Sequence, residues 1–154
     1  MPQMIAAETG KVLPEQEAYL YLIRAAEIVS APIVDLFSTS GVSGKQYNAL
    51  RSIRRAGKTG ATVNEIRLQM TDPRADVTRL IDRLVRDGLV RRKNDRADRR
   101  VVRVVLSEAG TTLLKKIDVP LLAIHQSQFS RFSVEELDQL KALLKQIVAA
   151  EPDE

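Results

Sequence analysis

The stretch "DVTRLIDRLVRDGLVRRKNDRADRRVVRVVLSEAG", residues 76–110, decides the fold because its apolar period changes partway along. Two β-branched runs, 89–93 and 101–107, follow Gly88 and flank the charged segment "NDRADRR" (94–100). Before Gly88, apolar residues recur at helical spacing, namely at Val77, Leu80, Ile81, Leu84 and Val85. The pattern predicts a helix followed directly by a β-hairpin with an arginine-rich tip.

The helix before the hairpin is predicted to have a basic outer face. Asp72 and Pro73 suit an N-cap and a first helical residue, and Gly88 suits a left-handed stop. With about 100° of rotation per residue, Arg79 and Arg86 lie nearly opposite the apolar stripe. One face of this helix should therefore enter the core while the other carries positive charge.

Two capping boxes precede this helix. Ser43 and Gln46 form the first and open a helix that ends near residue 55, and Thr62 and Glu65 form the second and open a shorter helix. Two short helices, the second of them amphipathic, followed at once by a hairpin make a winged helix-turn-helix. We therefore predict a DNA-binding lobe over residues 43–106.

Long helices are predicted on both sides of this lobe, over 15–38 with a bend near Pro32 and within 107–150 with a kink at Pro120. The first has no close partner in the sequence, and the last carries a leucine seam at alternating spacings of three and four. An ordinary intramolecular core stripe is the alternative to dimerisation here. The predicted dimerisation residues are Leu20, Ile23, Leu137, Leu140, Leu144 and Ile147.

The composition favours one mainly helical domain spanning residues 1–154, an α+β fold in which the only sheet is the small β-hairpin wing. Only 4% of residues are aromatic, there is no cysteine, and there is one histidine, so we expect no disulfide, no metal site and no cofactor. No apolar run approaches the roughly 18 residues of a membrane span, and a signal peptide pattern is lacking, which predicts a cytoplasmic protein.

The positive charge is concentrated in one fifth of the chain. Between Arg74 and Arg103, eleven Arg and Lys stand against five Asp, although the net charge of the whole chain is only +4. Such a footprint is typical of a surface that neutralises DNA phosphates. The alternative interpretation of this charge is a solvated face that binds no ligand. For the hairpin tip, the alternative is that the charges keep an exposed edge strand soluble and prevent aggregation. In the DNA-binding interpretation, Asp98 holds a neighbouring guanidinium in one rotamer.

Residues 76–110 resemble the MarR family of bacterial transcription regulators, with their recognition-helix run, their "D-x-R" wing and their "LSEAG" start to the next helix. "KQYNALRSI" (45–53) resembles the second helix of the family. The resemblance implies a homodimer that binds a pseudo-palindrome in double-stranded DNA. Recognition-helix contacts are assigned to Arg74, Asp76, Thr78, Arg79 and Arg83, and wing contacts to Arg96, Asp98, Arg99 and Arg100.

The resemblance also implies a small-molecule effector, phenolic or anionic, that binds between the dimerisation helices and the lobe. The polar residues assigned to such a pocket are Tyr19, Tyr21, Tyr47 and His125, although tyrosines on helices more often close a core. No set of residues assembles a catalytic site, since "SGVSG" (40–44) lacks the spacing of a nucleophile elbow. We therefore predict a non-enzymatic repressor; the alternative is a helical interaction protein whose basic lobe binds an acidic protein.

Overall fold

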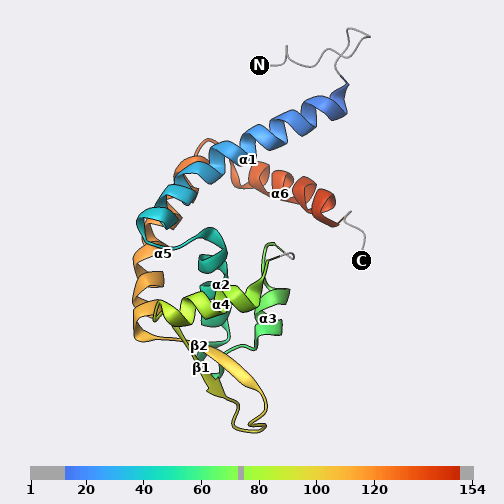
Figure 1. Ribbon diagram of the computed structural model, residues 1–154. Helices are drawn as coiled ribbons and strands as arrows, with labels where there is room; N and C mark the ends of the chain where they lie inside the picture. The colour runs from blue at the N-terminus through green and yellow to red at the C-terminus, as the bar shows by residue number, and fades with distance from the viewer. Residues whose placement is uncertain (1–12, 73–74, 150–154) are drawn as a thin grey trace.

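A computed structural model describes residues 13–72 and 75–149. It confirms a mainly helical fold with one antiparallel hairpin (Figure 1). In chain order the elements are α1 (Pro14–Thr39), α2 (Gly44–Arg55), the 3-10 turn η2 (Gly57–Thr59), α3 (Val63–Leu68), α4 (Val77–Arg86), β1 (Val90–Asn94), β2 (Val102–Leu106), α5 (Glu108–Gln128) and α6 (Val134–Ala149).

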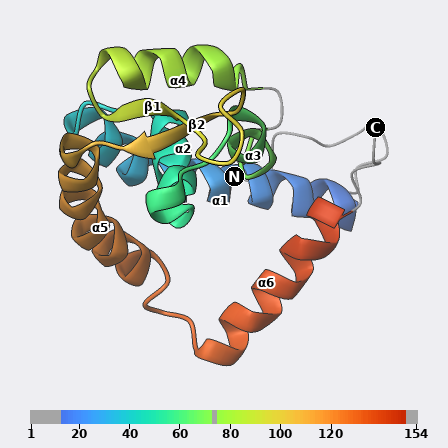
Figure 2. The same cartoon turned by 90° about the horizontal axis from the view of Figure 1, so that it is seen from below.

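The helices and the hairpin divide into a winged lobe and an outer set of helices. In the lobe, α4 packs against α2, α3 and β1, and β2 packs against α2. The α1 and α6 helices lie at the end of the molecule opposite the hairpin tip, and α5 connects the two ends (Figure 1). Seen from below, α4 lies along one outer edge and α6 projects away from the lobe (Figure 2).

The predicted capping boxes are confirmed. The Ser43 hydroxyl accepts from the Gln46 amide at 3.1 Å while the Gln46 side chain accepts from the Ser43 amide at 2.9 Å. Thr62 and Glu65 make the same reciprocal pair. A third capping box, formed by Ser133 and Glu136, precedes α6. Each cap contributes about 1 kcal/mol, so these helix starts are fixed by local sequence.

The start of the recognition helix differs from the sequence-based prediction. The α4 helix begins at Val77, and its N-cap is Asp76, whose carboxylate accepts from the Arg79 amide at 3.1 Å. The Asp72 carboxylate forms an ion pair with Lys45 at 2.7 Å instead of opening this helix. Two aspartates four residues apart can both cap, and the tertiary contact to α2 decides between them.

The core lies where α2, α4, α5 and the hairpin meet. The predicted apolar stripe of α4 is confirmed, because Val77, Leu80, Ile81 and Leu84 are all buried. The largest side chains with almost no exposed surface are Leu50, Ile53, Ile66, Ile81, Leu84, Leu114, Ile117, Val77 and Val104. This core fixes α4 so that its basic face remains outside.

The junction between α4 and α5 depends on a close backbone approach. The Ser107 amide donates to the Leu89 carbonyl at 3.0 Å, and the Ser107 hydroxyl donates to the Gly88 carbonyl at 2.6 Å. Gly110, in the first turn of α5, lies so close that an added Cβ would be 2.1 Å from the Leu89 carbonyl oxygen. This contact explains the glycine in "LSEAG" without invoking DNA.

We expect Gly110→Ala to lower the free energy of unfolding by about 1–3 kcal/mol or more, because backbone must move to accept the methyl group. Gly44→Ala is the matched control, since its Cβ would meet only the Phe37 ring at 3.8 Å. Urea denaturation of both variants measures the difference. Equal stabilities would contradict the close packing of α5 on the chain before β1.

Candidate nucleic-acid interface

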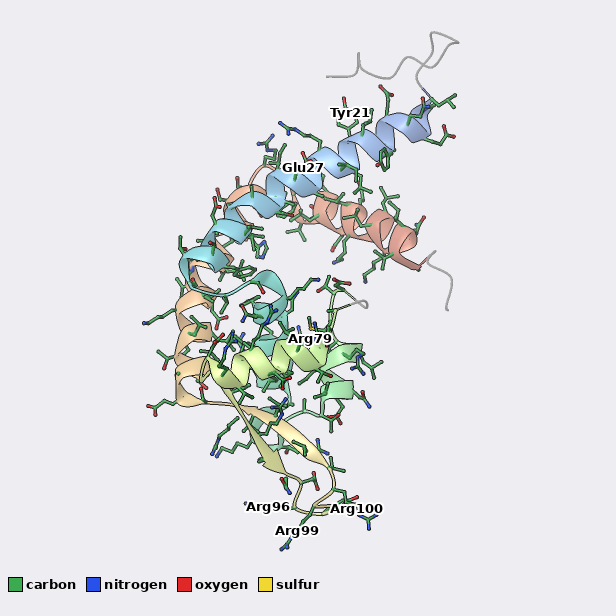
Figure 3. The ribbon with its side chains drawn as sticks, viewed as in Figure 1. Tyr21, Glu27, Arg79, Arg96, Arg99 and Arg100 are labelled. Carbon is green, nitrogen blue, oxygen red and sulfur yellow. The ribbon has the colours of Figure 1, made fainter. Side chains whose placement is uncertain are left out.

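The outer face of α4 is polar and basic. Thr78, Arg79 and Arg83 are all exposed, and Arg79 lies beside the helix N-terminus (Figure 3). The Arg79 guanidinium is 3.3 Å from the Asp76 carboxylate, with side chains 82% and 59% exposed. Asp76 thus caps α4 and also steadies Arg79, while Arg74 lies outside the described residues.

A polar ladder on α2 holds the connection between α3 and α4. Its three members are spaced by three and four residues, so they share one face of α2. Each reaches a residue of the chain just before α4, at distances of 2.7 to 3.2 Å; the pairs are Lys45–Asp72, Asn48–Thr71 and Ser52–Gln69. These three contacts could not be predicted from the sequence, which shows the spacing of the α2 residues but not their partners.

Three arginines occupy the tip of the wing. Arg96, Arg99 and Arg100 are exposed and extend from the turn beyond β1 and β2 (Figure 3). None of the three forms an ion pair with any residue in 13–72 or 75–149. The strands that hold them out pair in register from Val90 opposite Leu106 to Asn94 opposite Val102. The wing therefore presents three exposed guanidinium groups at one end of the molecule.

Asp95 builds the turn that carries these arginines. One carboxylate oxygen accepts from the amides of Ala97 at 2.8 Å and Asp98 at 3.2 Å, and the other pairs with the Arg103 guanidinium. Arg103 also donates to the Gly60 carbonyl at 3.2 Å, which ties the wing to the connection between α2 and α3. Neither Asp95 nor Arg103 was among the sequence-predicted residues, because their pairing spans the hairpin.

The predicted role of Asp98 requires correction. Its carboxylate accepts from the Arg100 backbone amide at 2.9 Å, and within the described residues it pairs with no guanidinium. A short carboxylate side chain in a turn readily bonds to the backbone amide two residues on. Asp98 therefore shapes the backbone under Arg100 instead of fixing an arginine rotamer.

The Asp95 carboxyl should titrate at an unusually low pH. The pKa of this carboxyl is lowered from 3.8 to about 2. The largest cause is the hydrogen bond from Arg103, and the backbone amides of Ala97 and Asp98 contribute next. A lowered folded-state pKa means that its stabilising contribution is complete above about pH 3.8 and is lost as the pH falls through about 2.

NMR titration of the Asp95 carboxyl carbon should give a midpoint near 2. In Arg103→Gln the midpoint should rise, because the largest cause of the lowering is removed, yet stay below 3.8 while the two amides still donate. A midpoint in the wild-type chain near the ordinary value would contradict this structure of the wing.

The tyrosines and the histidine assigned to a pocket do not converge within one chain. Tyr47 is buried, stacks on Phe37 with ring centroids 4.4 Å apart, and has a raised pKa because of that burial. Tyr19 and Tyr21 are exposed on α1, and Tyr19 lies five helical turns before Phe37, or about 27 Å. His125 is exposed on α5. Tyr47 therefore belongs to the core junction of α1 and α2.

Most of the residues assigned to dimerisation are exposed or only partly buried in the single chain. No residue of α6 is buried, and Leu144 and Ile147 are 37% and 58% exposed. Leu137, Leu140 and Leu144 line a groove of about 650 Å³ along α6. On α1, Ile23 is 45% exposed, although Leu20 is partly covered. Exposed apolar side chains that gather on one face often mark a protein–protein contact.

The fold and its exposed basic helix and wing define a DNA-binding protein of the winged helix-turn-helix class. The MarR family model matches residues 40–101. A MarR transcription factor from Planctomyces limnophilus is 36% identical, with a TM-score of 0.64, over 88% of this chain and 98% of that one. The chain belongs to the MarR family and is a transcription regulator.

The chain is also similar to a second transcriptional regulator and to a further solved structure. The HTH-type transcriptional regulator PecS of Dickeya dadantii is 27% identical over 82% of this chain and 76% of its own length. The fold is shared with Bordetella bronchiseptica BpsR, whose DNA binding is regulated by 6-hydroxynicotinic acid. That structure is 24% identical, with a TM-score of 0.70, over 86% of this chain and 98% of its own.

Two kinds of feature are absent from the part of the chain that the structure describes. No helix there is both long and apolar enough to cross a membrane. No group of three or more His, Cys, Asp or Glu side chains in it could hold a metal ion.

Proposed function

We propose that the protein is a homodimeric repressor that binds a pseudo-palindromic operator and acts by binding rather than by catalysis. The proposal rests on one observation: the charged surface and the exposed apolar surface lie on different parts of the molecule. Unpaired cations gather on the lobe over residues 43–106, whereas open apolar faces gather on the outer helices. Within this single domain, one surface suits phosphates and the other suits a second copy of the chain.

The α4 helix is assigned to the major groove. Its N-terminal half carries Asp76, Thr78 and Arg79, and Arg83 follows one turn later on the same side as Arg79. Arginine recognises guanine through two parallel hydrogen bonds, and threonine reaches phosphates or base edges. The ion pair with Asp76 is largely exposed to solvent, so Arg79 gives it up at little cost when a base or phosphate replaces the carboxylate.

The wing is assigned to the neighbouring minor groove. Arg96, Arg99 and Arg100 extend beyond the strands, and the turn beneath them is held by Asp95 and Asp98. A narrow minor groove has an enhanced negative potential that attracts inserted arginines. Since the turn is already ordered in the free protein, less conformational entropy is lost on binding.

The outer helices are assigned to dimerisation. A second copy would cover the leucine face of α6 and the open face of α1, and it would set the distance between the two α4 helices. A small anionic or phenolic effector would then release DNA by favouring a dimer with a different spacing. The regulation of BpsR by 6-hydroxynicotinic acid supports this class of effector.

Selection of binding sites from a pool of random duplexes tests the proposal. We expect an enriched inverted repeat whose half-site centres are about 10 base pairs apart, or a multiple of that, with two chains bound per duplex. An asymmetric motif occupied by one chain, or no enrichment over the input pool, would contradict it. A promoter carrying the selected site upstream of a reporter should be silenced when the protein is produced.

A further inference from the structure

The hairpin is held to the rest of the lobe on both of its faces. On one face, the Arg92 guanidinium lies 2.5 Å from the Asp82 carboxylate of α4. Successive side chains of a strand point to opposite faces, so Lys93 lies on the other face, where its ammonium donates to the Lys58 carbonyl at 2.5 Å. Arg103 is paired with Lys93 across the hairpin, which places its side chain on this second face. The connection between α2 and α3 therefore holds one face of the wing, and α4 holds the other.

A backbone contact holds the middle of β2 against the same connection. The Ala61 amide donates to the Val104 carbonyl at 3.0 Å, and the Val104 amide donates to the Ala61 carbonyl at 2.7 Å. Gly60 has a φ of +78°, and a Cβ added there would lie 2.6 Å from the Val104 carbonyl oxygen. This close approach fixes the middle of β2, whereas the three wing arginines lie beyond the ends of both strands.

Arg103 links the turn at the tip of the wing to this fixed region. Its Nε donates to the Asp95 carboxylate, which also accepts from two amides of the turn. Its Nη1 donates to the Gly60 carbonyl at 3.2 Å and to the Glu65 carboxylate at 3.4 Å. The same Glu65 oxygen accepts from the backbone amide at the N-cap of α3. One guanidinium therefore joins the tip of the wing, the connection before α3, and α3 itself.

The surroundings of Arg103 differ from those of the wing arginines. Its side chain is only 22% exposed, and the carboxylates of Asp95 and Glu65 compensate its charge. The three wing arginines are exposed and extend from the turn (Figure 3). A partly buried guanidinium with several acceptors around it is suited to holding protein groups in a fixed geometry, while an exposed one is suited to a phosphate.

We infer that Arg103 is a positioning residue for DNA binding, which acts through the three wing arginines and does not contact DNA itself. This inference rests on the proposed contact between the wing and the minor groove. In the free protein, Arg103 holds the Asp95 turn against the connection before α3, so the tip keeps one direction relative to α4. Without Arg103 the tip samples more orientations, and the entropy lost when DNA orders them opposes binding.

A double-mutant cycle tests whether Arg103 acts through the wing arginines. The probe is a fluorescent duplex that carries the inverted repeat enriched from the random pool, titrated with the full-length chain. We expect Arg103→Gln to weaken binding about tenfold in the wild-type background. In the triple alanine variant of the wing arginines, the same change should weaken binding by less than about twofold. Arg131→Gln removes the same charge from an exposed position outside the lobe and should leave the affinity of both backgrounds nearly unchanged.

Asp95→Asn separates positioning from net charge. The asparagine oxygen can still accept from the Ala97 and Asp98 amides, but the ion pair with Arg103 is lost. Removal of a negative charge by itself would strengthen binding to DNA, whereas loss of the positioning contact should weaken it about threefold or more. Heteronuclear NOE values of the amides of residues 96–100 should fall, because the turn becomes more mobile. If Arg103→Gln does not fold, Asp95→Asn takes its place in the cycle.

Failure of this inference can be told apart from failure of the proposed function. An equal loss of affinity from Arg103→Gln in both backgrounds would make Arg103 a direct contact to DNA and would overturn the inference. Unchanged affinity in Arg103→Gln, or tighter binding by Asp95→Asn, would also overturn it while leaving the role of the wing intact. If the triple alanine variant binds the duplex as the wild-type chain does, the wing does not touch DNA, and both proposals fail.

Discussion

Replacing Leu140 and Leu144 with aspartate is expected to give a monomer that binds operator DNA about a hundredfold or more weakly than the wild-type chain. Both side chains line the open groove on α6, and a carboxylate there would be buried without a partner in the dimer. A monomer binds one half-site only and loses the high effective concentration of the second lobe. No residue of α6 is buried in the single chain, so the winged lobe itself should remain folded.

Gln139→Asp/Gln146→Asp is the control for this prediction. It adds the same charge to exposed positions on α6, and both lie more than 100° around the helix from the centre of the face formed by Leu137, Leu140 and Leu144, counting about 100° per residue. Sedimentation equilibrium should report a dimer for the control and a monomer for Leu140→Asp/Leu144→Asp. A leucine variant that remains dimeric would place the dimer interface somewhere else.

Removing the three wing arginines is expected to produce the second large effect. In Arg96→Ala/Arg99→Ala/Arg100→Ala, each lobe is without its three unpaired wing cations, and operator affinity should fall about a hundredfold or more. The plot of log affinity against log salt should also become shallower, by about 0.9 for each phosphate that is no longer neutralised. Fluorescence anisotropy across a salt series measures both quantities.

The control for the wing is Lys115→Ala/Lys116→Ala/Arg131→Ala, which removes the same charge from exposed positions outside the lobe. Its affinity and salt slope should stay close to those of the wild-type chain. If both triple variants show the same fall in affinity, net charge rather than the wing explains DNA binding. If neither does, the wing does not touch DNA.

Features encoded within a few residues could be predicted from the sequence. The caps at Ser43 and Thr62 need a partner only three residues on, and the apolar stripe of α4 needs only helical periodicity. The hairpin follows from two β-branched runs, and its observed strands, Val90–Asn94 and Val102–Leu106, differ from those runs by about one residue at their ends. These signals define the lobe and place its basic face.

Features that depend on tertiary contacts could not be predicted. Asp72 and Asp76 both suit an N-cap, and only the ion pair with Lys45 shows that Asp72 belongs to the connection before α4. Asp98 resembles a residue that fixes an arginine, but Asp95 is the one that pairs with Arg103 across the hairpin. The sequence shows that these residues are charged, whereas the fold determines which charges are paired.

We propose that this chain recognises a particular DNA site as a dimer. The most direct test is binding of the purified full-length protein to the DNA upstream of its own gene, with excess non-specific competitor, followed by hydroxyl-radical footprinting. Competitor-resistant binding with a two-fold symmetric footprint is the predicted result. Binding that the competitor abolishes, with no footprint at any salt concentration, would contradict recognition of a particular site by a dimer.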